Sequence, residues 1–377
     1  MQKGIGILLA LLLVCGIVGC KKAPAPAPQP KQESVKEEQN PLPTPKPEPE
    51  GPLVGIYLPG DQWQAAGAFL ERELVQKGYR AQLLYADHDA TLQAQQIENI
   101  IAEEPVCLVV MPEDSVALLE AEKAAKEAGV PIVAYDRLLM ETNAVAGLVT
   151  FDYEAIGREI GNYLITKQKL DTATEEDRTY TIEFFMGSTE DHSAFLLHKG
   201  LMEQLQPYLD SGALKCKSGR TAFADTYVLH GQKEQAVRKC TDLLTNTYRK
   251  APPDILCTAS DALAEGCLEA LGQMTYEGDP QVLITGQGGE LEAVQRVVSG
   301  KQTMTVYKDW ETLATQCAEV VDAIVKKETP RWSQQTFHNQ AVTVPACMVP
   351  GVVVDKANYK KTIVEAKIYS LDALPKE

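Results

Sequence analysis

The sequence predicts an α/β protein built from two open, parallel sheets, each covered by helices on both faces. From residue 53 onward, short runs that are apolar throughout alternate with amphipathic stretches of helical period. Strands buried on both faces have this continuous apolar character, and helices between them connect parallel neighbours. The alternation proceeds to Asp152 and then starts again, over a length sufficient for two domains. We therefore expect two doubly wound, Rossmann-like lobes.

The expected elements follow one another in a regular order. In the first series the strands are LVGIYLP, AQLLYA, VCLVVMP, PIVAYD and LVTFD, with helices at 62–77, 91–103 and 115–128. The second series begins with a helix to Lys167 and continues with the strands TIEFFMG, ALKCKSG, DILCTA and QVLITG, with helices at 193–205, 233–247, 262–271 and 291–298. Polar residues directly after such strands lie where ligands bind in doubly wound sheets.

The first 20 residues indicate export and lipid attachment. Lys3 precedes an apolar run from Ile5 to Val18, which is shorter than the roughly 20 residues that a membrane-spanning helix needs. The run ends in IVGC, which resembles the bacterial lipobox, so we predict a signal peptide over residues 1–19 and acylation of Cys20. An uncleaved membrane anchor is the alternative. Either way the remaining chain is expected on the extracytoplasmic face of the cell membrane, in a periplasm or at the outer surface.

Residues 20–52 form the expected linker and hold ten of the 22 prolines. Such a composition buries no core and favours extended polyproline II structure, so the segment is expected to act as a semi-rigid stalk. A peptide ligand for a proline-binding domain is the alternative. No later apolar run has membrane-spanning length, so we expect the folded part to lie in water.

Composition excludes several classes of protein. The formal net charge of −16 argues against nucleic acid as a partner. Seven cysteines remain besides Cys15 and Cys20, an odd number, so at least one is unpaired or bonded to another chain. Most lie in apolar strands or helices, where a thiol behaves as a small hydrophobic group. No CxxC or HxxxH spacing occurs, and no metal or cofactor is predicted.

An enzyme is not predicted either. The five histidines are scattered, and neither a nucleophile-elbow nor a phosphate-loop motif is present. The run Asp87-His88-Asp89 imitates a metal cluster, but three consecutive side chains do not all face one ion, and a loop at a strand end is the simpler account.

The motifs at the strand ends resemble those of the type I periplasmic solute-binding proteins, most closely the xylose-binding and multiple-sugar-binding branch. The similar stretches are YAD, QIEN, VPIVAYDRL, TFDYEAIG, IEFFMGSTEDHSAF, ALKCKSG, TASDALAEG, TGQGGE and TVYKDWETLA, which occur in this order over nearly all of residues 53–365. The resemblance implies a sugar held between two lobes that are joined by three hinge crossings, and a monomer that delivers its ligand to the permease of an ABC transporter. By this analogy one lobe is 53–150 plus 308–340, the other is 151–307 plus 341–365, and 366–377 is a tail.

The same resemblance points to the ligand-binding residues. Asp136 and Arg137 match a strand-end pair in which the carboxylate accepts from sugar hydroxyls and the guanidinium donates, with a surface salt bridge as the alternative. Asp261 and Lys308 correspond to sugar-contacting positions, although a helix cap and a solvated lysine are the alternatives. Trp63 is expected to stack on a pyranose face. Phe195 is expected either opposite it or in the core. Gln287, His192 and Ser193 complete the predicted set.

Several positions depart from the family pattern. Gln62 replaces an arginine, Ala65 and Ala66 replace acidic residues, His192 and Ser193 replace amides, and Gly288 replaces an aspartate. Each lost charge-assisted hydrogen bond is worth about 1.5–3 kcal/mol, or roughly ten- to hundredfold in affinity. Three explanations compete: a sugar with different hydroxyls, a different small polar molecule, or a pocket that no longer binds. A sensory role, in which the loaded protein signals to a chemoreceptor or sensor kinase, remains the alternative to transport.

Overall fold

The structure is a computed structural model, and it describes residues 50–173, 175–189, 191–278 and 280–376. The predicted signal peptide, Cys20 and nearly all of the expected linker lie outside the described residues. Among the described helices, none combines the length and the apolar character that crossing a membrane requires.

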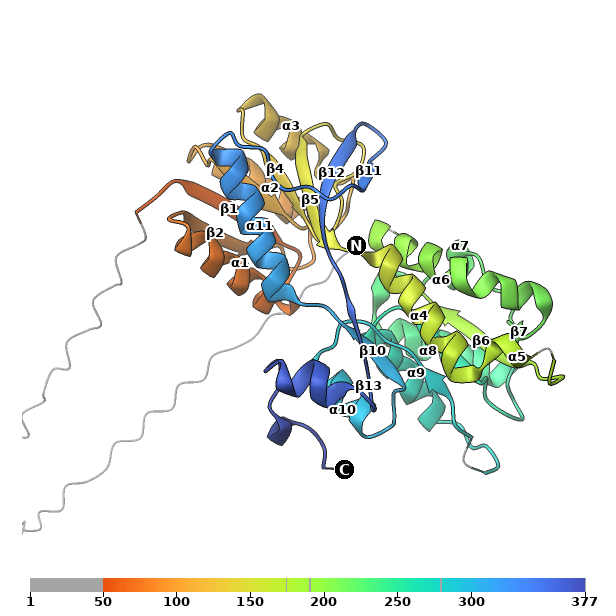
Figure 1. The fold of residues 1–377 in the computed structure, drawn as a ribbon. Helices are drawn as coiled ribbons and strands as arrows, with labels where there is room; N and C mark the ends of the chain where they lie inside the picture. Colours follow the sequence, from red (N-terminus) through yellow and green to blue (C-terminus); the bar gives the residue numbers. More distant parts are fainter. Residues whose placement is uncertain (1–49, 174, 190, 279, 377) are drawn as a thin grey trace, which may run out of the picture. The chain divides into compact units, whose positions relative to one another are not determined.

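The first sheet has seven strands in the order β11-β12-β5-β4-β3-β1-β2 (Figure 1). All neighbours in it are parallel except β11 and β12, which form an antiparallel pair at one edge. The strand bounds are β1 Leu53–Leu58, β2 Arg80–Tyr85, β3 Cys107–Val110, β4 Ile132–Tyr135, β5 Val145–Phe151, β11 Thr336–His338 and β12 Thr343–Val349.

Both faces of this sheet are buried, which explains the unbroken apolar runs. Along β1, Val54 and Ile56 pack in the core cluster that also holds Leu70 of α1, whereas Tyr57 packs in the cluster of the other face, with Ile97 of α2. Alternate residues of a strand point to opposite faces, so a fully buried strand needs apolar residues at every position. The covering helices are α1 Gln64–Gln76, α2 Ala90–Ile101, α3 Leu119–Glu127 and α11 Trp310–Val325.

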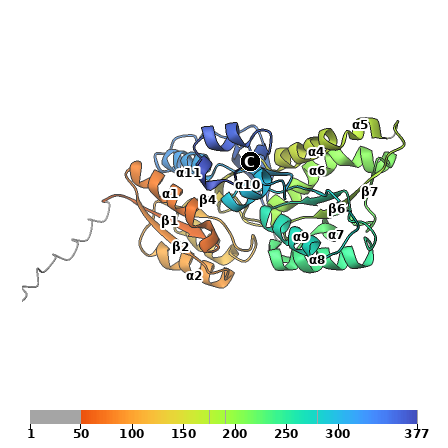
Figure 2. The ribbon, with the colours of Figure 1, turned by 90° about the horizontal axis from the view of Figure 1, so that it is seen from below.

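The second group of strands contains a parallel sheet, β7-β6-β8-β9, and an antiparallel pair, β10-β13. Figure 2 shows α4 and α6 on one side of β6 and α8 and α9 on the other. The strands are β6 Tyr180–Phe185, β7 Leu214–Lys215, β8 Ile255–Thr258, β9 Leu283–Ile284, β10 Met304–Tyr307 and β13 Val352–Asp355. The helices are α4 Tyr153–Gln168, α5 Leu170–Ala173, α6 His192–Ser211, α7 Phe223–Thr226, α8 Lys233–Asn246, α9 Asp261–Gly272 and α10 Leu291–Val298, with short turns η1 Asp61–Trp63, η2 Leu229–Gly231, η3 Lys360–Glu365 and η4 Leu371–Ala373.

The expected order of strands and helices is therefore present, with two notable differences at boundaries. Helix α6 continues to Ser211 and contains Pro207, although the sequence predicted its end at 205. A proline interrupts the hydrogen bonding of a helix without necessarily ending it, because packing of the apolar face compensates. Helix α3 begins at Leu119, four residues later than predicted.

The division of the C-terminal segment also differs from the prediction. Residues 341–365 were expected to join the second lobe, but β12 pairs with β5 of the first sheet, with Ala346 opposite Leu148 and Val349 opposite Phe151. The rest of the segment joins the second group, where β13 pairs with β10 and Ile363 of η3 packs with Val294 of α10. The chain thus passes between the two groups of strands after β5, after β10 and between β12 and β13 (Figure 1).

The last of these passages is sterically tight at Gly351. A Cβ atom on Gly351 would lie 2.5 Å from Cγ1 of Val306 and 2.8 Å from Cγ1 of Ile156. Real Cβ atoms do not approach other heavy atoms this closely, so only glycine allows the segment to pass between β10 and α4 in this arrangement.

Candidate binding site

A cavity of about 640 Å³ lies at the carboxyl ends of the strands of both groups. The loops after β1, β2, β3 and β4 contribute one part of its lining, and α4, α6, α9 and the loops around them contribute the other. The predicted residues that line it are Trp63, Asp136, Arg137, Ser193, Gln287 and Lys308. A second cavity, of about 770 Å³, lies at the opposite, amino ends of β3 and β4. Among the described residues that line it, Glu104 and Lys327 alone are charged, so these residues form no set of binding groups.

Asp136 is a buried acceptor in the lining of the 640 Å³ cavity. It follows β4 with a φ of 62°, a conformation that costs about 1–3 kcal/mol in a residue other than glycine and is concentrated at functional sites. Its backbone is fixed on both sides, since its N–H donates to Val149 O at 2.7 Å and its carbonyl accepts from the Thr150 hydroxyl at 2.7 Å. The strain is therefore imposed by β5, and it directs the carboxylate into the cavity.

A hydrogen-bonded chain links this carboxylate to a buried lysine. The Tyr153 hydroxyl donates to Oδ1 of Asp136 at 2.7 Å, and the Lys308 ammonium donates to the Tyr153 oxygen at 3.1 Å. Burial raises the pKa of Asp136, and the charge of Lys308 together with the Tyr153 hydrogen bond opposes that rise. Burial and the charge of Asp136 raise the pKa of Tyr153, so its hydroxyl keeps its proton and remains a donor.

Aromatic rings surround the Lys308 ammonium. Its Nζ lies 5.2 Å from the ring centroids of Phe151 and Tyr153 and 5.0 Å from that of Trp310. Trp63 packs edge-on against Trp310, with ring centroids 5.2 Å apart. Cations are attracted to the faces of aromatic rings, more strongly where water is excluded. The lysine is therefore held in place by its surroundings before any ligand binds.

Arg137 connects the two parts of the lining. Its guanidinium lies 5.5 Å from the Trp63 ring, donates to Pro112 O at 3.2 Å, and approaches Oδ2 of Asp191 to 3.8 Å. Asp191 also caps α6, because its other oxygen accepts from the backbone N–H of Ser193 at 2.9 Å and from the Ser193 hydroxyl. Ser193 thus lines the cavity with its hydroxyl already engaged by Asp191.

Gln287 carries an unpartnered donor at the cavity. The residue is 7% exposed, and its side-chain Nε2 has no hydrogen-bond partner among the described residues. The indole N–H of Trp63 is in the same situation. Leaving a buried donor unpaired costs about 1–3 kcal/mol, so an acceptor on a bound ligand would stabilise these two side chains.

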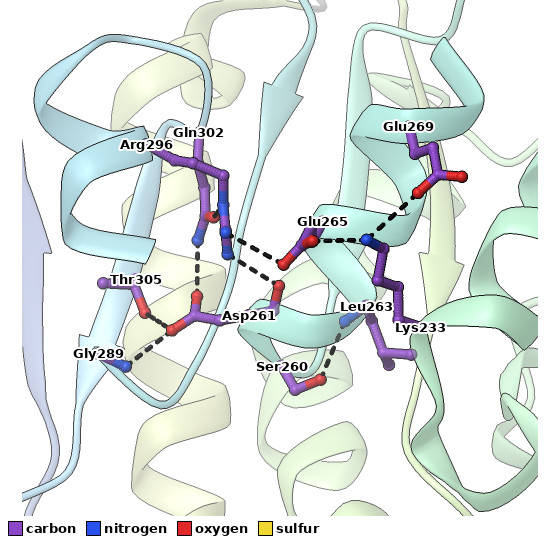
Figure 3. Close-up of polar contacts among 10 residues, drawn as sticks. All are labelled: Lys233, Ser260, Asp261, Leu263, Glu265, Glu269, Gly289, Arg296, Gln302 and Thr305. Carbon is purple, nitrogen blue, oxygen red and sulfur yellow. Dashed lines mark hydrogen bonds and ion pairs between the residues drawn. The ribbon is translucent and has the colours of Figure 1, made fainter. Parts of the chain in front are cut away.

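Asp261, by contrast, lies outside the lining and has a structural environment (Figure 3). Its Oδ1 accepts from Gln302 at 2.7 Å, and its Oδ2 accepts from the Gly289 N–H at 2.7 Å and the Thr305 hydroxyl at 2.8 Å. These bonds connect α9 to β10 and to the loop after β9. The neighbouring Ser260, which caps α9 by accepting from Leu263 N at 3.2 Å, lines the cavity instead.

His192 and Phe195 also lie outside the lining. Their rings stack on each other with centroids 5.9 Å apart, and Phe195 is 44% exposed and packs edge-on against Phe223. Burial lowers the pKa of His192. Ser193, Ala194 and Leu197 are the residues of α6 that face the cavity.

The position of Gly288 is filled by another side chain. A Cβ atom there would lie 2.3 Å from a carboxylate oxygen of Glu290, so Glu290 occupies the space that an aspartate at 288 would need. The sequence placed Tyr153 and Asp191 among the polar residues that follow strands without assigning either of them a ligand contact, and it did not single out Glu290. Tyr153 and Asp191 stand directly after a strand and just before a helix, respectively, and that placement was the available signal.

The arrangement suits a small, polar ligand. Asp136 and Asp191 supply acceptors, Arg137 and Gln287 supply donors, and Trp63 supplies an apolar face, which together match the hydroxyls and C–H surface of a sugar. The described residues hold no group of His, Cys, Asp and Glu side chains that is able to bind a metal ion.

Comparison with known proteins identifies the class. Residues 54–329 match the model of the periplasmic binding protein domain family, and the chain belongs to this family. It has the type I periplasmic binding protein fold. The relatives below are periplasmic binding proteins and an ABC transporter solute-binding protein, in agreement with the predicted resemblance.

The individual relatives are sugar-binding proteins. The chain is 31% identical to the multiple sugar-binding periplasmic receptor ChvE of Rhizobium radiobacter over 85% of its own length and 92% of the relative's. It is 29% identical to the D-xylose-binding periplasmic protein of Escherichia coli, over 81% and 86%. An ABC transporter solute-binding protein of Clostridium phytofermentans, solved with bound β-D-glucose, superposes with a TM-score of 0.81 at 31% identity, covering 86% of this chain and all of that one.

Proposed function

We propose that the protein binds a monosaccharide in the 640 Å³ cavity and delivers it to the permease of an ABC transporter. The observation that carries the proposal is the cavity itself, because its lining includes the Asp136 carboxylate, which is held by Tyr153, the Gln287 side chain with its unpartnered Nε2, and the Trp63 ring. Fixed acceptors, free donors and an aromatic face are the groups that a sugar receptor needs. The sugar-binding relatives support the same class of ligand.

We further propose that the two groups of strands are the two lobes of the receptor, with the first lobe extended by β12 up to residue 349. Three passages of the chain between them favour hinge bending over free rotation. The protein acts as a monomer, has no enzymatic activity and needs no cofactor. A ligand-sensing role and a small polar ligand other than a sugar are the alternatives, because both use the same cavity.

A binding assay tests the ligand class. The Tm of the chain without residues 1–20 is measured in the presence of pentoses, hexoses, sugar acids, amino sugars and small metabolites that are not sugars. A ligand at a hundred times its Kd adds about 2.7 kcal/mol to the free energy of unfolding, which raises Tm measurably. We expect one or more monosaccharides to do so, and Asp136→Ala to abolish the effect. Asp210→Ala, which removes an exposed carboxylate on α6, is the matched control and keeps it. A rise with only non-sugars contradicts the ligand class.

The membrane attachment through Cys20 is tested separately. We propose that the full chain partitions with membranes because of an acylated Cys20, which mass spectrometry of the mature N-terminus detects. Cys20→Ser is expected to release the protein or leave an unprocessed precursor. An unmodified Cys20 in membrane-bound protein supports the uncleaved anchor instead.

A further inference from the structure

Three polar side chains from three loops form a continuous hydrogen-bonded wall on the first-sheet side of the cavity. Nε2 of His88 lies 3.0 Å from Oε1 of Gln62, and Nδ1 of His88 lies 3.2 Å from Oε2 of Glu113. All three residues line the cavity. We call them the Gln62–His88–Glu113 relay. Gln62 stands where the resemblance described above predicts an arginine, so the relay lies at a predicted departure from the family pattern.

The backbone around the relay is built to hold it. Gly60 leaves the space, because a Cβ atom there would lie 2.6 Å from both the His88 ring and the Gln62 amide oxygen. Asp87 and His88 both have positive φ values, 48° and 61°, and the His88 N–H is tied to Pro59 O at 2.8 Å. Two consecutive non-glycine residues in this region cost about 1–3 kcal/mol each. The hydrogen bond from the His88 N–H helps to offset this cost. It therefore stabilises the turn and fixes the position of the imidazole.

The other end of the relay is fixed from within the core. The Glu113 backbone N–H donates to Oε1 of Gln93 at 2.9 Å, and Gln93 is fully buried and donates to Met111 O at 2.8 Å. The loop that presents the Glu113 carboxylate is therefore anchored by a buried amide.

The chemistry of the relay gives it two states. The Glu113 carboxylate only accepts hydrogen bonds, so Nδ1 of His88 carries a proton. When Nε2 is protonated as well, it donates to Oε1 of Gln62, and the NH₂ group of that amide is left for the cavity. When Nε2 is neutral it is an acceptor, the amide turns over to donate its NH₂ to the ring, and its oxygen is left for the cavity.

Other charges surround this wall. Asp136, Arg137, Asp191, His230 and Lys308 line the same cavity, and Asp61, Asp87 and Asp89 flank the relay in its own loops. His230 is the only other histidine among the described lining residues, so it is the natural control for a pH effect.

We propose that the protonation state of His88 selects which end of the Gln62 amide faces the ligand, so that the cavity prefers a sugar acid when His88 is protonated and the parent sugar when His88 is neutral. The proposal rests on the proposed sugar-binding function. A carboxylate substituent accepts from the NH₂ end and is repelled by the oxygen end, whereas a hydroxyl donates or accepts and tolerates both. The positive charge of the imidazolium acts in the same direction. Gln62 contacts the ligand, and His88 and Glu113 are positioning residues.

Calorimetric titrations test the selection. The ratio of the Kd of glucuronate to that of glucose, and of galacturonate to galactose, is measured between pH 5.5 and 8.0. We expect the ratio to increase about ten- to hundredfold with pH for the better-bound pair, the equivalent of one charge-assisted hydrogen bond. His88→Asn is expected to make the ratio independent of pH, whereas His230→Asn keeps the full dependence. Gln62→Met separates amide reversal from charge, because it removes the amide and leaves His88; the ratio then changes less than in the parent protein.

Two results overturn the proposal: a ratio that does not change with pH in the parent protein, or one that still changes in His88→Asn. A nuclear magnetic resonance titration of the ligand-free protein distinguishes failure of the relay from failure of the sugar-binding function. The Gln62 side-chain amide signal, assigned by its loss in Gln62→Met, is expected to shift with the same midpoint as the His88 ring. If the two midpoints agree and no sugar binds, the relay is supported and the proposed ligand class is contradicted. If the amide signal does not shift with the His88 ring, the relay is contradicted.

Discussion

The Tyr153 hydroxyl lies 2.7 Å from Oδ1 of Asp136, and the two residues belong to different halves of the cavity lining. Asp136 follows β4 of the first sheet, and Tyr153 begins α4, directly after the first passage of the chain between the two groups of strands. The acceptor expected to bind the sugar is thus held by the segment at which the two halves join.

Removing this hydrogen bond is expected to affect both binding and its pH dependence. Tyr153→Phe takes away a donor that lowers the pKa of Asp136, so the carboxylate becomes protonated at higher pH. We expect a roughly tenfold weaker Kd near pH 7 and a further loss as the pH falls, because a protonated Asp136 accepts fewer hydrogen bonds. Calorimetry from pH 5 to 8 measures this. Tyr163→Phe removes a comparable tyrosine–aspartate bond, 3.1 Å long and away from the cavity, and is expected to leave Kd unchanged. Equal effects of the two variants would contradict the assignment.

The positive charge of Lys308, and not only the length of its side chain, is expected to contribute to ligand binding. Lys308→Met keeps an apolar side chain among the Phe151, Tyr153 and Trp310 rings but removes the charge that lowers the pKa of Asp136. We expect the ligand to bind about tenfold more weakly. The loss of affinity should be smaller at higher pH, because Asp136 is then ionised again. Lys199→Met, which breaks an exposed pair with Glu154, is the control and keeps the parent Kd. A Lys308→Met protein that binds like the parent would show that the ammonium has no role.

Substitutions of Asp261 and Ser260 are expected to differ in how much they affect stability and how much they affect binding. Asp261→Ala leaves the Thr305 hydroxyl and the Gly289 N–H without their acceptor and removes one of the two acceptors of Gln302 Nε2, so the free energy of unfolding is expected to fall by about 3 kcal/mol. Ser260→Ala removes one helix cap, worth about 1 kcal/mol, together with a group that lines the cavity. Denaturant unfolding and calorimetry measure the two effects. The structure predicts a larger Kd change per unit of lost stability for Ser260→Ala, and the reverse order would place the Asp261 carboxylate at the ligand.

Glu122 is expected to make the stability of the protein depend on pH. This side chain of α3 is fully buried, and burial raises its pKa to about 7, with a smaller opposite effect of Thr142. A carboxyl whose folded-state pKa exceeds its unfolded value binds more protons when folded, so stability decreases as the pH rises from about 4.5 to about 7 and then levels off. Glu122→Gln should remove that decrease and exceed the parent by up to about 3 kcal/mol at pH 8, while matching it near pH 4.5. Unfolding curves at both pH values test this, and equal stability at pH 8 contradicts it.

The sequence predicted the architecture because the strands are buried on both faces, and such runs differ plainly from amphipathic helices. It also placed Trp63, Asp136 and Lys308 at the cavity, since strand ends converge there. Three predicted residues lie outside the lining, each one or two positions from a lining residue near the start of a helix. A change of one residue turns a helical side chain by about 100°, so Asp261 and Ser260 exchange roles, and His192 and Phe195 lie on a different side of α6 from Ser193.

Long-range pairing was the other feature that the sequence did not specify. β12 and β13 are similar apolar runs separated only by Pro350 and Gly351, and nothing local indicates that one pairs with β5 and the other with β10. Likewise, the relay depends on three loops whose convergence is set by the order of the strands in the sheet.

The late position of β12 in the chain has a consequence for how the protein folds. Leu148 and Val149 of β5 find their neighbours at Ala346 and Cys347 only after nearly the whole polypeptide has been made. Until then β5 is an open edge of the growing sheet, and unpaired edges of this kind invite association with other chains. Closing such distant contacts is slow, so this edge is expected to stay open for longer than the other edges of the sheet. A chain cut short before residue 343 would keep that edge exposed, so early termination is expected to yield aggregates rather than a smaller receptor.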